Sequence, residues 1–150
     1  MLSRRVSRFA VTIAGGLLLS GCGVLGPGGP TVEVAILEQG LLWTTLVDTA
    51  RVRASPEEVV VELKEGFSQA NYGVRADASQ SSHEVLLNVV THRTDDVVLA
   101  TPVFRRYRLT VRSVEPGYYR LRLVWRNEFL VPAARVRTLV DTMITIPNRP

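Results

Sequence analysis

The sequence predicts an α+β domain, a two-layer sandwich in which an antiparallel β-sheet carries one or two helices on one face. Three observations favour this class. Several segments alternate apolar and polar side chains, as half-buried strands do. Ser55-Pro56-Glu57-Glu58 has the pattern of a helix start, and apolar residues at spacings of three and four follow it. The same spacing returns after Pro132, near the end of the chain.

Two strands are expected before the first helix. In residues 32–37, Val32, Val34 and Ile36 alternate with other side chains, and Gly40 interrupts the pattern. The second strand is expected over residues 46–54. Its apolar and polar residues separate onto two sides, Ala50, Val52 and Ala54 on one and Thr49, Arg51 and Arg53 on the other.

The first helix is expected to begin at Pro56. Ser55 is placed to accept the amide of Glu58, and the Glu58 carboxylate to reach back to the Ser55 amide, as in a capping box. Residues 71–73 supply its end. The run of three valines at 59–61 is unfavourable in a helix, so packing on a sheet must supply the stability. The expected buried stripe consists of Val59, Val60, Leu63, Phe67 and Ala70.

Three strands are expected over residues 72–78, 85–92 and 97–114, separated by polar turns at 79–84 and 93–96. A hairpin through Glu115-Pro116-Gly117 would then return the chain, with Gly117 in the left-handed conformation. A three-residue loop pairs apolar side chains throughout, whereas a two-residue Pro-Gly loop mixes the faces. The pairs expected from the longer loop are Val111 with Leu121, Leu109 with Leu123, and Tyr107 with Trp125.

A second helix is expected over residues 133–144, because Val136, Leu139, Val140 and Met143 have helical spacing. Residues 145–150 are expected to form a loose tail.

The amino-terminal residues have the build of an export signal. Arg4, Arg5 and Arg8 precede an apolar run over residues 9–19, which is too short to span a bilayer, and Leu19-Ser20-Gly21-Cys22 follows. These residues resemble the lipobox of bacterial lipoprotein precursors. The resemblance implies cleavage between Gly21 and Cys22, acylation of the Cys22 thiol, and acylation of the new amino terminus with chains such as palmitate.

The predicted organisation is therefore a signal peptide at 1–21, a lipidated cysteine with a flexible Gly/Pro tether at 22–30, and a single α+β domain at 31–150. The resemblance also implies a location. A retention aspartate would follow the cysteine in an inner-membrane lipoprotein, and Gly23 stands there. The expected site is the cell envelope, with the chain lipid-anchored on the periplasmic face of the outer membrane.

The charge does not indicate a nucleic-acid partner. The formal net charge is +4, but three of the 18 Lys and Arg residues belong to the signal, which leaves 15 against 14 Asp and Glu. The mature chain is nearly neutral, and no nucleic acid is expected as a partner. Cys22 is the single cysteine, so the exported domain must fold without a disulfide.

No residue pattern indicates catalysis, a cofactor or a metal. Residues 81–84, Ser-Ser-His-Glu, contain a nucleophile, a base and an acid, but neighbours in one turn do not form a catalytic triad. His92 with Asp95 and Asp96 is better explained as a solvated turn than as a ligand set. We therefore expect no enzyme. A hydrolase would require His83 or His92 to meet a nucleophile in a cleft.

The candidate functional patch is an arginine face on the expected hairpin. Its six members would lie on one sheet face and would suit phosphate or carboxylate groups, while a solvated face balanced by acids elsewhere is the alternative. The members are Arg106, Arg108, Arg112, Arg120, Arg122 and Arg126. Arg112 is expected opposite Arg120, and Arg106 opposite Arg126. Anionic lipid, lipopolysaccharide or an acidic protein surface would be the partner.

The order of elements resembles small envelope-assembly lipoproteins of the BamC and LptE type, on the residues 72–74, 85–87 and 107–111. This resemblance implies a non-enzymatic accessory or assembly subunit that binds a protein partner of an envelope machine, by a sheet edge or the arginine face. The alternative is a carrier or sensor of an amphipathic or anionic ligand such as a lipid. A pocket lined by Leu63, Phe67, Leu123 and Trp125 would favour the carrier, and a filled core there would favour the subunit.

Overall fold

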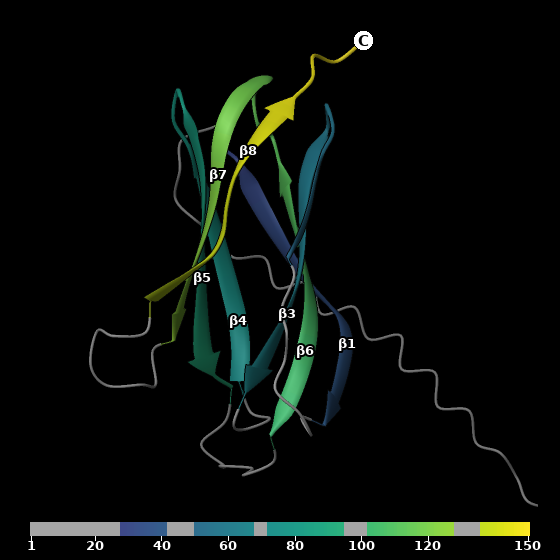
Figure 1. The fold of residues 1–150 in the computed structure, drawn as a ribbon, viewed down its shortest axis with the longest axis vertical. Coiled ribbons are helices and arrows are strands. Elements are labelled where there is room, and N and C mark those ends of the chain that lie inside the picture. Colours follow the sequence, from purple (N-terminus) through teal and green to yellow (C-terminus); the bar gives the residue numbers. More distant parts are fainter. Residues whose placement is uncertain (1–27, 42–49, 68–71, 95–101, 128–135) are drawn as a thin grey trace, which may run out of the picture.

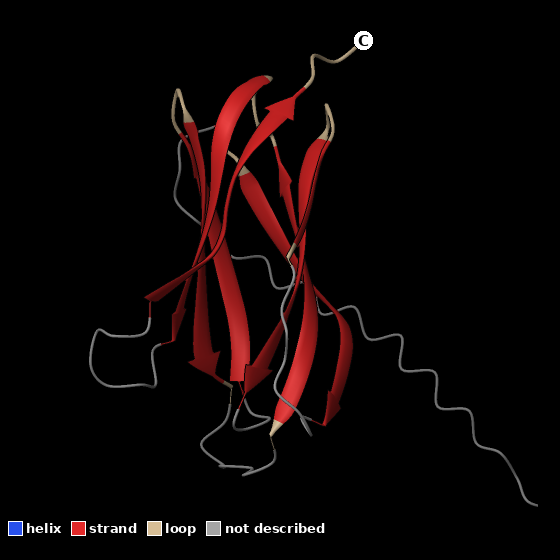
Figure 2. Cartoon of the chain, viewed as in Figure 1, coloured by secondary structure: helices blue, strands red, loops and turns tan. Residues whose placement is uncertain are grey.

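Strands and turns make up the whole of the described chain. The computed structural model describes residues 28–41, 50–67, 72–94, 102–127 and 136–150. In chain order the strands are β1 (Thr31–Leu41), β2 (Arg51–Ala54), β3 (Glu58–Phe67), β4 (Tyr72–Gln80), β5 (Glu84–Arg93), β6 (Val103–Arg112), β7 (Gly117–Asn127) and β8 (Val136–Ile146). Figure 2 shows these residues without a helix. The predicted α+β class is therefore wrong, and the described part of the chain is all-β.

The strands form two four-stranded sheets that face each other (Figure 1). Sheet A has the order β1-β6-β3-β2, and sheet B has the order β4-β5-β7-β8. Neighbouring strands are antiparallel except β5 and β7, which are parallel. At the sides of the sandwich β1 contacts β4, and β2 contacts β8. The predicted single sheet is thus two sheets packed face to face.

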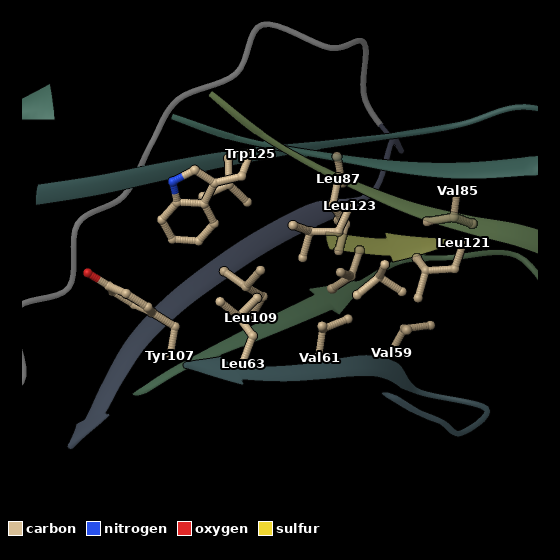
Figure 3. Packing of buried hydrophobic residues seen from close by; sticks show 14 of the residues in the cluster. Val59, Val61, Leu63, Val85, Leu87, Tyr107, Leu109, Leu121, Leu123 and Trp125 are labelled. Atoms are coloured by element: carbon tan, nitrogen blue, oxygen red, sulfur yellow. The ribbon is translucent and has the colours of Figure 1, made fainter. Parts of the chain in front are cut away.

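The core lies between the sheets, as Figure 3 shows. Alternate residues of each central strand point inward, because the side-chain period of a strand is two. The inward residues with the least exposure are Val59, Val61 and Leu63 from β3, Tyr107, Leu109 and Val111 from β6, Val85, Leu87 and Val89 from β5, and Leu121, Leu123 and Trp125 from β7. Apolar burial from both sheets therefore holds the fold together without a disulfide in the described residues.

Polar groups enter the interior at one end of the sandwich. Arg105 is only 7% exposed, and its guanidinium donates hydrogen bonds to Gln39 Oε1 at 2.7 Å and to the carbonyl oxygen of Tyr72. Glu65, directly opposite Arg105 in the register, accepts a 2.5 Å hydrogen bond from Arg137. Burial raises the pKa of Tyr107 to about 12, although the nearby Arg105 guanidinium opposes that shift. This end of the core joins strands of both sheets through charged groups.

The helix predicted from Pro56 onward is strand β3. Ser55 Oγ does accept the amide of Glu58, at 3.2 Å, but it also donates to the Glu58 carbonyl oxygen at 3.1 Å, and the Ser55 amide donates to the same oxygen at 2.9 Å. The serine therefore closes the β2–β3 turn and begins no helix. The three valines at 59–61 are β-branched and favour a pleated strand. The expected stripe was wrong at Val60, which points away from the core while Val61 is buried.

The helix predicted over residues 133–144 is also a strand, β8, so far as it is described. The register shifts by one residue around Leu139, where Val140 pairs with Leu123 but Thr138 pairs with Val124. Such a β-bulge breaks the period of two. Leu139 and Val140 flank this bulge, whereas Val136 and Met143 are exposed, so the spacings of three and four do not mark one buried face. Residues 133–135 lie outside the described residues.

The predicted hairpin between the sixth and seventh strands does not form. β6 pairs with β1 and β3 in sheet A, whereas β7 pairs with β5 and β8 in sheet B. The connection at residues 113–116 crosses between the sheets, and Ser113 has a φ of 60° there. Val111, Leu109 and Tyr107 do share the core with Leu121, Leu123 and Trp125, but they face them across the sandwich. The alternation of apolar and polar side chains shows which face of a sheet a residue occupies. It does not show which strand pairs with that residue's strand.

Other strand predictions are confirmed. The predicted strands at 32–37, 72–78 and 85–92 correspond to β1, β4 and β5, and part of 97–114 corresponds to β6. Of the strand predicted at 46–54, only 51–54 is described as strand. The predicted signal peptide at 1–21, Cys22 and residues 23–27 of the tether lie outside the described residues.

Candidate functional site

The six arginines of the predicted patch lie on two sheets. Arg106, Arg108 and Arg112 belong to β6 and point to the outer face of sheet A. Arg120, Arg122 and Arg126 belong to β7 and point to the outer face of sheet B. The expected pairs of Arg112 with Arg120 and of Arg106 with Arg126 are therefore wrong. The chain reverses between these strands but places them in different layers, so the predicted single arginine face does not exist.

On sheet A, each of the three β6 arginines has a carboxylate partner from a neighbouring strand. Arg106 bonds to Glu38 of β1. Arg108 donates from Nε at 3.0 Å and from Nη2 at 2.8 Å to one oxygen of Glu62 of β3. Arg112 lies 3.2 Å from Glu33 of β1 and 3.7 Å from Glu58 of β3. The bond to Arg108 lowers the pKa of Glu62 below its ordinary value of 4.5. These arginines are neutralised within the sheet.

On sheet B, two of the three β7 arginines are paired. Arg120 and Asp141 form two hydrogen bonds of 2.7 Å, from Nε to Oδ1 and from Nη2 to Oδ2. Arg122 donates to Glu84 at 3.2 Å. Among the described residues, Arg126 has no carboxylate within ion-pair distance. Bonding to Arg120 lowers the pKa of Asp141 below its ordinary value of 3.8, and the same bond raises the pKa of Arg120.

The Arg120–Asp141 pair predicts a pH dependence of stability. The pKa of Asp141 is lower in the folded state, so its carboxylate stabilises the fold above pH 4 and that contribution is lost as the pH falls through the lowered pKa. We expect Asp141→Asn to reduce the slope of the free energy of unfolding against pH below about pH 4. Urea unfolding at a series of pH values measures this slope.

Asp77→Asn is the matched control, because the exposed Asp77 carboxylate accepts a hydrogen bond from the side-chain amide of Asn88 and forms no ion pair with the described residues. This variant is expected to retain more of the wild-type slope. An unchanged slope in Asp141→Asn would show that the pair with Arg120 does not couple protonation to folding.

A shallow groove of about 540 Å³ runs over the outer face of sheet A. Its charged lining alternates in sign, because carboxylates from β1 and β3 stand beside guanidiniums from β2 and β6. Those side chains are Glu33, Glu58, Glu62, Arg53, Arg108 and Arg112. Between them Ala35, Val60 and Thr110 form a floor of small side chains. The groove therefore suits a ligand with both charges, or with an extended backbone, better than a compact polyanion.

The cations of this face that lack a carboxylate partner come from β2. Arg51 and Arg53 are exposed, and neither forms an ion pair with a carboxylate of the described residues. Glu62 lies directly opposite Arg51 but is bonded to Arg108 on its other side, and Val60 lies opposite Arg53. Alternation places both arginines on one side of a strand, but no sequence pattern predicts a role for them. The signal available in the sequence was their spacing, because two arginines that are two positions apart in a strand share one face.

The alternative catalytic and metal sites gain no partner in the described residues. Ser82 Oγ lies 2.6 Å from His83 Nδ1 in the exposed β4–β5 turn. The Glu84 carboxylate bonds to Arg122 and does not orient His83. His92 lies on β5, and its Nδ1 is buried without a hydrogen-bond partner, while Asp95 and Asp96 lie outside the described residues. Within the described ranges, no three His, Cys, Asp or Glu side chains are grouped so that they could hold a metal ion.

The four residues that would line an internal ligand pocket instead pack together between the two sheets. Leu63, Phe67, Leu123 and Trp125 all belong to the buried core, and the ring centroids of Phe67 and Trp125 are 6.4 Å apart. Figure 3 shows Leu63, Leu123 and Trp125 pointing into the space between the sheets, and all four side chains are at most 4% exposed.

The fold and the outer faces define a class, a β-sandwich of two four-stranded sheets whose exposed arginines are mostly neutralised by acids of adjacent strands. Comparisons with protein-family models, with curated proteins and with solved structures gave no significant match. In the part of the chain that the structure describes, no helix has the length and apolar character to cross a bilayer.

Proposed function

We propose that this chain is a membrane-anchored envelope lipoprotein that acts as a non-enzymatic accessory or assembly subunit and binds a protein partner of an envelope machine. The observation that carries this proposal is the position of the lipobox cysteine. Cys22 stands nine residues before Thr31, where β1 begins at the edge of sheet A. Nine residues extend to about 30 Å at most, so an acylated Cys22 would keep sheet A close to the bilayer surface.

The packed interior supports work by surface contact. A carrier of an amphipathic ligand needs an apolar cavity, and the described core is occupied where such a cavity was expected, at Leu63, Phe67, Leu123 and Trp125. The outer face of sheet A offers a groove with charges of both signs in its place. Mixed charge gives specificity to protein contacts, because a wrong partner brings like charges together.

Anionic lipid or lipopolysaccharide is less well supported as the partner. Five of the six arginines proposed for that role already have carboxylate partners, and they lie on opposite faces. An anion would have to displace those partners. The location on the periplasmic face of the outer membrane is part of the proposal and depends on Gly23.

Site-specific photocrosslinking in intact cells tests the proposal. A photoreactive amino acid at Ala35, on the groove floor, is expected to give a protein adduct of defined size. The same probe at Ser79, on the outer face of sheet B, is the matched control and should give little of that adduct. In a Cys22→Ser background the Ala35 adduct should decrease, because the domain is no longer held at the membrane. Absence of any protein adduct from Ala35, or equal adducts from both positions, would contradict the proposal.

A further inference from the structure

The short strand β2 forms one edge of sheet A, and in the described residues it comes near β8 of the other sheet without backbone pairing to it. In the described residues β2 is the last strand of the sheet and pairs only with β3. It consists of four residues, Arg51–Ala54, whereas β1 at the other edge has eleven. Strand edges of this kind carry unpaired backbone groups and accept a strand from another chain.

The hydrogen-bonding pattern shows which backbone groups face that edge. The Ser55 amide donates to the Glu58 carbonyl oxygen at 2.9 Å, so Ser55 and Glu58 form a hydrogen-bonded pair. In an antiparallel ladder such pairs alternate with pairs that are not hydrogen-bonded. Arg53–Val60 and Arg51–Glu62 are therefore hydrogen-bonded pairs as well. The backbone amides and carbonyls of Val52 and Ala54 then point away from β3, toward the open edge.

The side chains of β2 complete a docking surface. Arg51 and Arg53 extend to the outer face, and among the described residues neither lies within ion-pair distance of a carboxylate, although the charge of Arg53 does help to lower the pKa of Glu62. Val52 and Ala54 point to the inner side and are only half-buried. A strand that bonded to Val52 and Ala54 would place the residues opposite Arg51 and Arg53 in its non-hydrogen-bonded pairs, in which side chains approach most closely. Two carboxylates separated by one residue would meet both guanidiniums.

We infer that the open edge of β2 binds an extended acidic segment of a protein partner, which adds to sheet A as a further strand with carboxylates at positions i and i+2 on Arg51 and Arg53. This inference rests on the proposed function and names the chemistry of the partner. The spacing of the two guanidiniums and the free backbone groups of the same strand point to one extended ligand.

A phosphate surface fits the same residues less well. Glu58 and Glu62 line the groove beside Arg53, and Glu33 lies at its other side, so a layer of phosphates would approach three carboxylates. A single strand at the edge would place its carboxylates on the two guanidiniums, and neutral or basic parts of the same partner would lie over the groove. The charge distribution therefore favours a peptide with spaced acids over a lipid headgroup surface.

Fluorescence anisotropy with a labelled peptide tests the inference. The probe has two glutamates at i and i+2 between valines and threonines, and it is titrated with the full-length mature protein in detergent. We expect binding that is weakened about tenfold by Arg51→Glu combined with Arg53→Glu, since two exposed ion pairs are lost. A peptide with glutamines in place of the glutamates should bind equally weakly to the wild type. Methylation of the peptide amides that face β2 should also weaken binding.

Arg126→Glu is the matched control for Arg53→Glu, because it reverses an exposed arginine of sheet B that likewise lacks a carboxylate partner. It should leave the affinity unchanged, and circular dichroism should confirm that the variants remain folded. The inference is overturned if Arg53→Glu and Arg126→Glu bind the peptide equally. It is also overturned if phosphatidylglycerol vesicles, and not the peptide, lose binding to the Arg51→Glu, Arg53→Glu protein.

The cellular crosslink separates this inference from the proposed function. If the Ala35 adduct disappears in the Arg51→Glu, Arg53→Glu protein, the β2 edge carries the docking. If the adduct persists in that protein, the inference fails while the proposed function stands. If the wild-type protein itself gives no adduct, the proposed function fails.

Discussion

Replacing Trp125 by alanine is expected to lower the free energy of unfolding by about 3–5 kcal/mol. Trp125 is only 2% exposed and packs against Tyr107 of sheet A at a ring-centroid distance of 5.7 Å. Its Nε1 donates a 2.9 Å hydrogen bond to Thr91 Oγ1, and Thr91 is fully buried. The substitution would create a cavity between the sheets and leave a buried hydroxyl without this donor. Urea unfolding followed by circular dichroism measures the loss.

Tyr118→Ala is the matched control on the same strand. The Tyr118 side chain is 64% exposed on the outer side, so its removal should change the free energy of unfolding by less than about 0.5 kcal/mol. A loss below about 1 kcal/mol for Trp125→Ala would contradict a core that is continuous between the sheets at this end.

Replacing Cys22 by serine is expected to remove the protein from the outer-membrane fraction almost completely. The hydroxyl of serine does not replace the thiol as the acylation site, and the chain would keep its first 21 residues. Because at least two acyl chains are needed for stable attachment, the loss of the single cysteine would remove the whole of the proposed anchor. Fractionation of cells with immunodetection measures the change in location and in mass.

Ser20→Ala serves as the control for that substitution, since it exchanges one small residue for another before the cysteine and leaves the thiol in place. This variant should be processed and anchored as the wild type. A Cys22→Ser protein that stays fully in the outer membrane with unchanged mobility would contradict a lipid anchor at this residue.

Faces of strands were predictable from the sequence, and the class of the fold was not. Alternation assigned Leu121, Leu123 and Trp125 to the core and Arg120 and Arg122 to the outer side, as the structure has them. In β3 the same residues satisfied two periods, since Val59, Leu63 and Phe67 are compatible with a helix and with a strand. The β-branched composition around Val60 favours the strand, and this preference outweighs the helix-start pattern at Ser55.

The motif Ser-x-x-Glu explains why residues 55–58 were wrongly predicted to begin a helix. The turn at residues 81–84 repeats the contacts of the turn at residues 55–58. Ser81 Oγ accepts from the Glu84 amide at 3.2 Å, and the Ser81 amide donates to the Glu84 carbonyl oxygen at 2.8 Å. The same serine-to-amide bond begins a helix in a capping box and closes a hairpin here. The motif therefore marks a chain reversal or a helix start, and only the following residues decide between them.

The charges of the arginines explain the strand order, which the alternation of side chains left undetermined. A β6–β7 hairpin would have placed Arg112 opposite Arg120, a pairing of like charges that destabilises a sheet. In the structure Arg112 stands beside Glu33 and Glu58, and Arg120 bonds to Asp141. A solvated face balanced by acids was the alternative to a ligand, and carboxylates of neighbouring strands do balance five of the six arginines. The repulsion was a sign that these strands belong to different sheets.

The candidate site was only partly accessible from the sequence. The pairing of each arginine with an acid depends on the order of the strands in the sheet. No local sequence pattern predicts that order. The open edge of β2 depends on the same order, together with the short length of that strand. Arg51 and Arg53 are candidates because neither lies within ion-pair distance of a described carboxylate, and Glu62, opposite Arg51, is bonded to Arg108.

The account depends most on a lipid anchor at Cys22, because the proposed contacts are made by a domain held at a membrane. Mass spectrometry of the amino-terminal peptide, from protein purified out of membranes, measures this directly. We predict a chain that begins at Cys22, with acyl chains attached through its sulfur atom and on its amino terminus. A chain that begins at Met1, or a Cys22 with a free thiol and an unmodified amine, would contradict the account.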